Sequence, residues 1–392
     1  MDANSVKAGV RQAIGGLIPG ALAACLVTGL LAAGSPAGSR AGSSAGTGKP
    51  GSWNPKAAAA YLDQREDWWT AWPPAARDRG TFCVSCHTAV PYGLSRPALR
   101  VALAEAGPSA SEQKLLDNVT KRVRLWNEVA PFYNDEKDGA HKTEQARGTE
   151  AVLNALILVS RDAGTGKPSD DARAALDNMW ALQRTAGDDR GAWAWIQFNN
   201  EPWEAYDSQY YGACLAAVAV GSVSQDYRST PAIQSNLQML REYLNRESAR
   251  QSPINRMVLL WASGKWPGLL PREGQESIIK EAVGLQRADG GWNLAALVGP
   301  WKRADGTPLE AGSDGYATGL ITLALEQAGL PRSDPHLQQG LAWLIHNQNP
   351  ADGSWPASSL NRQLDPAYGP GRFMSDAATA YAVLALTEAK SP

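Results

Sequence analysis

The chain has 392 residues, a formal net charge of −2 and 19% charged residues. This length is enough to bury a large core in one or two domains. The near-neutral charge argues against a nucleic-acid partner, which would require a basic face.

Residues 1–33 have the pattern of a membrane anchor or a secretion signal. Lys7 and Arg11 precede residues 13–33, which carry no charge. As a helix, that segment would extend about 31 Å, enough to span a bilayer, and the preceding positive charges would keep the N-terminus in the cytoplasm. The alternatives are a cleaved signal peptide and a lipoprotein processed at Cys25. All three predict a chain that faces the periplasm. We expect an uncleaved anchor in a bacterial inner membrane; the alternatives give a lipoprotein or a soluble periplasmic protein.

Residues 34–52 are rich in Gly, Ser and Ala and show no hydrophobic periodicity. This composition is typical of a flexible linker. We therefore expect one folded domain over residues 53–392, joined to the membrane by the linker.

Residues 83–87 read Cys-Val-Ser-Cys-His, the C-x-x-C-H pattern of a covalently attached c-type haem. Two thiols three positions apart can each add to one vinyl group of the same porphyrin. The imidazole of His87 can then bind the iron as the proximal ligand. The sequence therefore predicts one covalent haem c, attached to Cys83 and Cys86 and ligated by His87.

Three other interpretations of Cys83 and Cys86 are weaker. A thioredoxin-type pair would lie in a βαβ pattern, which the neighbouring sequence lacks. A zinc site needs four ligands, usually with a second close Cys or His pair, and the remaining cysteines, Cys25 and Cys214, are isolated. A disulfide between Cys83 and Cys86 would be strained.

From residue 53 onward the chain alternates two kinds of helix. Amphipathic helices, which have one wet face, alternate with helices that are apolar on every side and rich in small residues. We expect the amphipathic, outer helices near 56–71, 111–129, 170–184, 231–247, 273–287 and 334–347. We expect the apolar, inner helices near 90–106, 145–162, 207–221, 253–263, 314–328 and 375–389. Six such hairpins must stack to bury their faces, and they can close into an (α/α)6 toroid; an open solenoid is the alternative.

Three outer helices are followed by a Gln, a Gly and a Trp at similar spacing. The pairs are Gln286 with Trp292, Gln348 with Trp355 and, with a longer insert, Gln183 with Trp193. This pattern resembles the QW motif of the squalene–hopene and oxidosqualene cyclase superfamily over residues 140–392. The resemblance implies an (α/α)6 toroid in which the Gln caps a helix end, the Trp packs on it, and the outer helix is tied to the next inner helix. The Asp-x-Asp-Asp acid of the protonating cyclases is missing, so the resemblance implies the scaffold and not the activity.

The motif at 83–87 falls between the first outer and the first inner helix, so we expect the haem at one rim of the toroid. Trp68, Trp69, Trp72, Phe82 and Tyr92 are candidates to wall the porphyrin, and Arg77, Arg79 and Arg96 are candidates to pair with its propionates. For the sixth ligand of the iron, the sequence favours Met374, in the segment before the last inner helix, over His141. An open sixth position is the third possibility.

Acidic residues also stand at the starts of inner helices. Asp207, Asp314 and Asp376 are best interpreted as helix caps. Residues 201–204 (Glu-Pro-Trp-Glu) precede the third inner helix at the expected rim, and we assign no chemistry to them.

These features predict a membrane-tethered, periplasm-facing mono-haem cytochrome c that transfers electrons. Its expected partner is a membrane redox complex, of which it is an accessory subunit, or another electron-transfer protein. One alternative is a haem enzyme that acts on an apolar, isoprenoid-like ligand inside the toroid. The other is a structural subunit that serves as a docking platform.

Overall fold

A computed structural model describes residues 52–163, 166–367 and 369–389. In these ranges the regular elements are helices, apart from one antiparallel pair of two-residue strands, β1 (Ala76–Arg77) and β2 (Thr81–Phe82). This confirms the all-α prediction. The predicted anchor at 1–33 lies outside the described residues, as does all but the last residue of the predicted linker. None of the described helices combines the length and the apolar character needed to cross a membrane.

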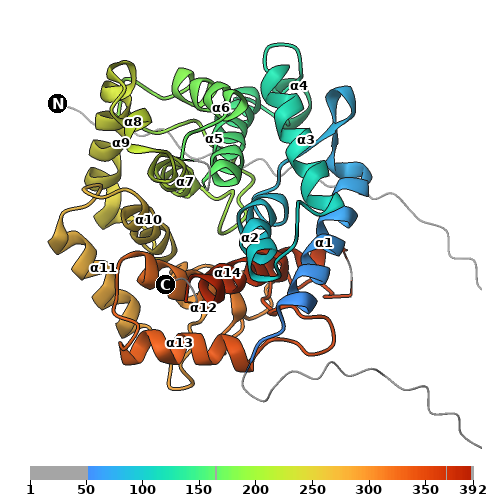
Figure 1. Ribbon diagram of the computed structural model, residues 1–392, viewed down its shortest axis with the longest axis vertical. Helices are drawn as coiled ribbons and strands as arrows, with labels where there is room; N and C mark the ends of the chain where they lie inside the picture. Colours follow the sequence, from blue (N-terminus) through green and yellow to red (C-terminus); the bar gives the residue numbers. More distant parts are fainter. Residues whose placement is uncertain (1–51, 164–165, 368, 390–392) are drawn as a thin grey trace, which may run out of the picture. The chain divides into compact units, whose positions relative to one another are not determined.

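Six helices pack side by side around the centre of the molecule (Figure 1). Each contacts the next in chain order, and the last contacts the first, so the six form a closed inner ring. They are α2 (Ala89–Ala102), α5 (Lys142–Asp162), α7 (Ser208–Ser222), α10 (Pro253–Lys265), α12 (Gly315–Gln327) and α14 (Phe373–Glu388). All six predicted inner helices are present, and α14 begins two residues earlier than expected.

Six further helices lie outside this ring, each packed against at least one inner helix. They are α1 (Pro55–Ala71), α3 (Ala110–Arg124), α6 (Asp170–Ala181), α9 (Gln234–Glu247), α11 (Arg272–Gly284) and α13 (Pro335–His346). These also match the predicted outer helices. Two four-residue helices, α4 (Asp135–Asp138) and α8 (Gln225–Arg228), and several 3₁₀ turns complete the described part.

The inner helices are largely buried because their sequences are apolar and small, and α7 shows this most completely. Every residue from Tyr210 to Val220 in α7 is buried. Small residues also set the distance between neighbours. A Cβ added at Gly319 of α12 would lie 2.7 Å from the backbone nitrogen of Ala382 in α14, so only glycine permits this approach.

The Gln and Trp of each repeat connect successive outer helices. Gln286 follows α11, and its Nε2 donates to the carbonyls of Gly290 and His336, the latter in α13. Trp292 is buried, and its Nε1 donates to the carbonyl of Ala282 at the end of α11. The glutamine partner therefore lies in the next outer helix and not in the next inner helix.

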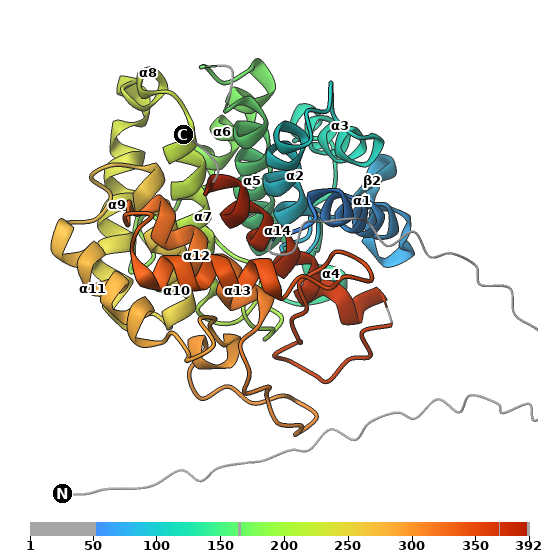
Figure 2. The same ribbon diagram turned by 60° about the horizontal axis from the view of Figure 1, so that its bottom comes forward.

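The other two repeats have the same hydrogen bonds. Gln183 donates to Gly191 and Asn236, and Gln348 donates to Gly353 and Asn54. Asn54 is the N-cap of α1, so the last repeat joins the end of the domain to its beginning. Figure 2 shows the long segments that precede α12 and α14 (orange and red) on one side of the ring.

Candidate functional site

The Cys-x-x-C-H motif lies in the segment between β2 and α2, and the backbone around it is held by specific hydrogen bonds. The carbonyl of Cys83 accepts from Nε1 of Trp69 at 2.7 Å. The backbone N–H of Cys83 donates to the carbonyl of Ala75. The Ser85 hydroxyl accepts from the N–H groups of Thr88 and Ala89, which caps the start of α2. The motif is therefore fixed between α1 and α2, where the sequence predicts it.

Both motif cysteines are buried free thiols. Cys83 is 7% exposed and Cys86 is 6% exposed. Burial raises the pKa of Cys83 to about 12 and raises that of Cys86 well above its ordinary value. Because the thiolate is the reactive species in disulfide exchange, both thiols are poorly suited to a thioredoxin-type reaction in this environment.

The imidazole of His87 has a defined hydrogen-bond partner on one nitrogen. Its Nδ1 lies 2.8 Å from Oγ1 of Thr88. The Thr88 hydroxyl donates its proton to Oδ2 of Asp376, also at 2.8 Å. The hydroxyl oxygen is thus free to accept, which requires the proton on Nδ1 of His87. The lone pair is then on Nε2, the arrangement in which a histidine binds a metal while its other nitrogen donates to an outer partner.

Asp376 of α14 is held by two residues of α1 and by Thr88, directly before α2. Arg65 of α1 donates to both carboxylate oxygens, with Nε–Oδ1 at 2.7 Å and Nη2–Oδ2 at 3.0 Å, and the Tyr61 hydroxyl donates to Oδ1 at 2.9 Å. Asp376 is 1% exposed. Burial raises its pKa, and the charge and hydrogen bonds of Arg65 oppose that rise. The expected role of Asp376 as a helix cap is wrong, because its carboxylate is used by Arg65, Tyr61 and Thr88.

Aromatic side chains surround His87. The ring of Phe373 stacks on the imidazole at a centroid distance of 3.6 Å, and Trp69 meets it edge-on at 4.9 Å. Trp203 lies 5.9 Å away. Burial, and to a smaller extent the charge of Arg65, lowers the pKa of His87 to about 3. The imidazole is therefore neutral at pH 7, as a metal ligand must be.

All five motif residues line one cavity. The remaining walls come from Trp69 of α1, from α5 and from the segments that precede α5 and α7; they are Phe132, Tyr133, Ala146, Thr149, Ile196 and Glu204. Three segments that lead from an outer to an inner helix therefore meet at this cavity. The position of a haem at the rim stays a prediction.

The donor chemistry of this cavity suits a haem c. Two free thiols and a neutral imidazole with an available Nε2 line the same space. The cavity volume is about 40 Å³, whereas cofactor pockets are about 300–1,000 Å³. A porphyrin would therefore require the aromatic side chains of the walls to move apart. Within the described ranges, no three His, Cys, Asp or Glu side chains are grouped as metal ligands.

Neither of the predicted sixth ligands lines the cavity. Met374 is 3% exposed and follows Phe373, whose ring stacks on His87. It lies in the first turn of α14 and not in a loop, because the 3₁₀ turn Gly369–Arg372 leads directly into the helix. His141 is an exposed residue at the start of α5, with a φ of 67°. The assignment of Met374 or His141 stays a prediction.

The other predicted neighbours have separate roles. Of the five aromatic candidates, Trp69 lines the cavity, whereas Trp68 and Trp72 pack with Phe373. Arg96 is buried and paired with Asp63 and Glu105, so it is not available to a propionate.

Of the other two aspartates predicted as helix caps, one caps its helix and the other does not. Asp314 caps α12, and its carboxylate accepts from the N–H of Ala317. Asp207 precedes α7 and instead accepts from Ser252 and Asn255.

Sequence reasoning missed the set formed by Thr88, Asp376 and Arg65. The three residues are far apart in the chain, and no spacing rule connects them. The one available signal was Thr88, a hydroxyl residue directly after the motif histidine.

No family model matches this chain, and no curated protein matches it.

Proposed function

We propose that this protein is a mono-haem c-type cytochrome that transfers single electrons. Cys83 and Cys86 would form thioethers to the two vinyl groups, each S–H adding across one double bond. His87 would bind the iron through Nε2. Bound in this way, a haem supplies an iron centre that exchanges one electron at a time.

One observation carries the proposal: the hydrogen bonds from His87 to Thr88 and from Thr88 to Asp376. They set the histidine tautomer and leave Nε2 available beside two buried thiols. Arg65 donates to both oxygens of Asp376, and the Thr88 hydroxyl donates to Oδ2 of the same group, so the Thr88 oxygen accepts from the imidazole. Such outer partners are typical of a histidine that ligates a metal.

We further propose that the scaffold is an (α/α)6 toroid of the kind found in the squalene–hopene cyclase superfamily. Support comes from the order of contacts among the six inner helices and from the repeated Gln and Trp hydrogen bonds. The proposal includes the scaffold only, because the acidic run of the protonating cyclases is missing from the sequence.

The centre of the ring favours an electron carrier over an enzyme for an apolar ligand. Tyr211, Tyr316 and Tyr381 are each at most 1% exposed. Tyr316 and Tyr381 meet edge-on at 5.3 Å, and the hydroxyls of Tyr211 and Tyr381 lie 3.5 Å apart. Side chains of the inner helices thus fill the space at the centre of the ring.

The proposed setting is the periplasmic face of a bacterial inner membrane, with residues 1–33 as the anchor. The partner would be a membrane redox complex or another electron carrier. The linker at 34–52 supports this setting, because a Gly/Ser/Ala-rich segment of that length allows the domain to approach a membrane-bound partner.

A redox titration tests the proposal. The full chain is produced in a host that attaches haem to C-x-x-C-H motifs, and its absorption spectrum is followed against the applied potential. We expect one centre that takes up one electron, with the α-band of a thioether-bound haem in the reduced state. Absence of that band in the purified protein would refute the proposal. Rapid binding of CO to a high-spin haem would favour the enzymatic alternative.

A further inference from the structure

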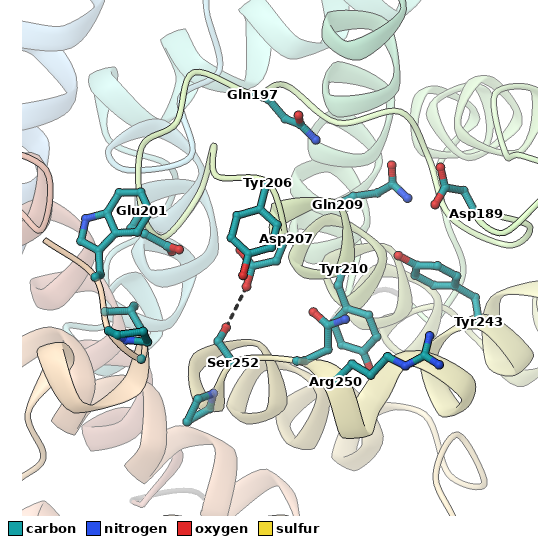
Figure 3. A pocket seen from close by; sticks show the side chains of 16 residues that line it. Asp189, Gln197, Glu201, Tyr206, Asp207, Gln209, Tyr210, Tyr243, Arg250 and Ser252 are labelled. Carbon is teal, nitrogen blue, oxygen red and sulfur yellow. Dashed lines mark hydrogen bonds between the residues drawn. The ribbon is translucent and has the colours of Figure 1, made fainter. Parts of the chain in front are cut away.

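A second, larger cavity lies at a different part of the ring (Figure 3). Its walls come from the segments that precede α7, α10 and α12 and from the ends of neighbouring helices. The cavity volume is about 810 Å³, within the range of about 300–1,000 Å³ that is usual for small-molecule sites. No residue of the Cys-x-x-C-H motif lines it.

Glu201 supplies a buried polar group with an unused hydrogen-bonding atom. The residue is 3% exposed, and no described residue partners its Oε2. Burial, with a smaller contribution from the charge of Asp207, raises the pKa of Glu201 to about 8. Burial therefore favours the neutral carboxylic acid over the carboxylate. A buried polar atom without a partner is costly, and a ligand hydroxyl would remove that cost.

The backbone of Glu201 is fixed by a distant residue. Its N–H donates to Oδ1 of Asn361 at 2.8 Å, and Nδ2 of Asn361 donates back to its carbonyl at 2.7 Å. This pair of bonds holds the acid in place. The two hydrogen bonds with Asn361 therefore hold a buried carboxyl group at the wall of the cavity. Such a fixed position is expected of a ligand-binding group.

A second acid of the cavity is also held in a fixed position. Oδ2 of Asp207 accepts from the Ser252 hydroxyl at 3.0 Å and from Nδ2 of Asn255 at 3.2 Å. The amides of Gln197 and Gln209 line the same space. Carboxyl and amide groups of this kind form hydrogen bonds with hydroxyl groups as both donors and acceptors.

Aromatic rings complete the lining. Tyr206 is 78% exposed, which is unusual for so large a ring, and Figure 3 shows it directed toward the same space as the carboxyl of Glu201. Trp301 is half-buried, with its Nε1 donating to the carbonyl of Leu360 at 3.0 Å. Aromatic faces pack well against the C–H faces of sugar rings, whose hydroxyls point sideways toward polar groups.

The charge balance favours a neutral ligand. Asp189 is paired with Arg184 at 3.0 Å, and Arg250 lies 3.5 Å from Glu247. Apart from Glu201, Asp207 is the lining acid without an ion pair among the described residues, so with Glu201 protonated the excess of negative charge in the cavity is small. A polyanion or a strongly cationic ligand would therefore lack a matching field.

We propose that this cavity binds a neutral saccharide, with Tyr206 as a stacking surface and Glu201 as a hydrogen-bonding group. The proposal rests on one arrangement: Glu201 is buried and its backbone is bonded to Asn361, and the exposed ring of Tyr206 lies in the same cavity, which has the volume of a ligand site. This cavity is separate from the proposed haem site, and the saccharide proposal does not depend on the haem proposal.

Calorimetric titration of the full chain with maltose, cellobiose and chitobiose tests the site. We expect at least one disaccharide to bind. Tyr206→Ala should weaken that binding about tenfold, the value of roughly one aromatic stacking contact. Because Tyr206 is largely exposed, this variant should fold normally. Glu201→Gln, which keeps a donor and an acceptor, should bind within about threefold of the wild type, and Glu201→Ala should bind at least about tenfold more weakly.

Glu326→Ala is the matched control. Burial raises the pKa of Glu326 to about 8, as for Glu201, and no described residue partners its Oε2, but it lies in α12 outside the cavity. It should bind the disaccharide like the wild type. Failure of all three disaccharides to bind would overturn the proposal. Equal affinity of Tyr206→Ala and wild type would overturn it as well.

Discussion

At the scale of single residues, Thr88 links the motif histidine to the rest of the domain. It is 2% exposed, and its hydroxyl is the only atom placed between Nδ1 of His87 and the carboxylate of Asp376 in the described contacts. A side chain of the same shape without the oxygen would leave both groups without this partner. A substitution that removes only the hydroxyl of Thr88 therefore separates the contribution of its hydrogen bonds from that of its packing.

Thr88→Val should lower the free energy of unfolding by about 1–3 kcal/mol, because a buried carboxylate loses a donor. Urea denaturation measures this loss. The control is Thr322→Val: Thr322 is fully buried, and no described residue partners its hydroxyl. That substitution should be neutral or slightly stabilising. Equal losses in the two variants would contradict the role of Thr88.

Glu66 makes stability depend on pH. It is fully buried in α1, and neither of its carboxyl oxygens has a described partner. Burial, and secondarily the charge of Asp376, raises its pKa to about 8 from an ordinary value of 4.5. Between these values the unfolded chain releases the proton while the folded protein keeps it. The free energy of unfolding therefore falls as the pH rises through this range, by at most about 1.4 kcal/mol per pH unit from this group.

Glu66→Gln should remove this dependence. The variant should be more stable than the wild type at pH 8, and the difference should vanish near pH 4, where both forms are uncharged. Chemical denaturation at several pH values measures it. The control, Glu273→Gln at an exposed position of α11, should stay within about 0.5 kcal/mol of the wild type throughout. Parallel profiles for Glu66→Gln and wild type would refute the prediction.

At the scale of elements, the twelve long helices were predictable from the sequence. Their apolar periodicity and the Gly- and Pro-rich segments between them mark each helix. The loops were not predictable to the same degree. The segment from residue 190 to 207 has no regular element, and its course depends on long-range contacts such as that between Glu201 and Asn361.

The residues of the candidate site also fall into those that the sequence predicts and those that only the structure reveals. Cys83, Cys86 and His87 follow from local spacing, which the sequence displays directly. Asp376 and Arg65 lie 311 positions apart, and only the closed ring brings them to the motif. The burial of Glu201 and its unpartnered Oε2 also required the structure, because neither property leaves a pattern in a sequence.

The repeated tryptophans contribute to stability through their N–H groups as well as their packing. Trp355 is fully buried, and its Nε1 donates to the carbonyl of Leu344 at 2.7 Å. Trp355→Phe should lower the free energy of unfolding by about 1–3 kcal/mol more than the control Trp261→Phe, because it leaves a carbonyl unpaired. Trp261 is similarly buried, but no described residue partners its Nε1. Thermal unfolding compares the two; a larger loss for Trp261→Phe would contradict the role of the bond.

At the scale of the whole molecule, the two ends of the domain are joined by one buried ion pair and by a pair of hydrogen bonds at the surface. Arg65 of α1 pairs with Asp376 of α14, and the side chains of both are at most 6% exposed. Gln348 donates to the carbonyl of Asn54 at 3.0 Å, and the N–H of Asn54 donates back to it at 2.6 Å. Ring closure and the orientation of His87 therefore depend on the same carboxylate.

Arg65→Met should lower the free energy of unfolding by about 3–5 kcal/mol, because it leaves a buried carboxylate without its counterion. The exposed pair of Arg272 and Glu276 in α11 provides the control: Arg272→Met should cost at most about 1 kcal/mol. Denaturant titration measures both variants. A loss of 1 kcal/mol or less for Arg65→Met would show that closure does not depend on this pair.

The covalent attachment of haem is tested by the intact mass of the mature protein made in a host that attaches c-type haem. We predict a polypeptide that carries one haem and retains it through acid–acetone extraction. Cys214→Ala, which removes a buried thiol outside the motif, should keep the haem. A double Cys83→Ala/Cys86→Ala variant should lose it. A wild-type mass without the added haem, or a haem removed by extraction, would contradict the account.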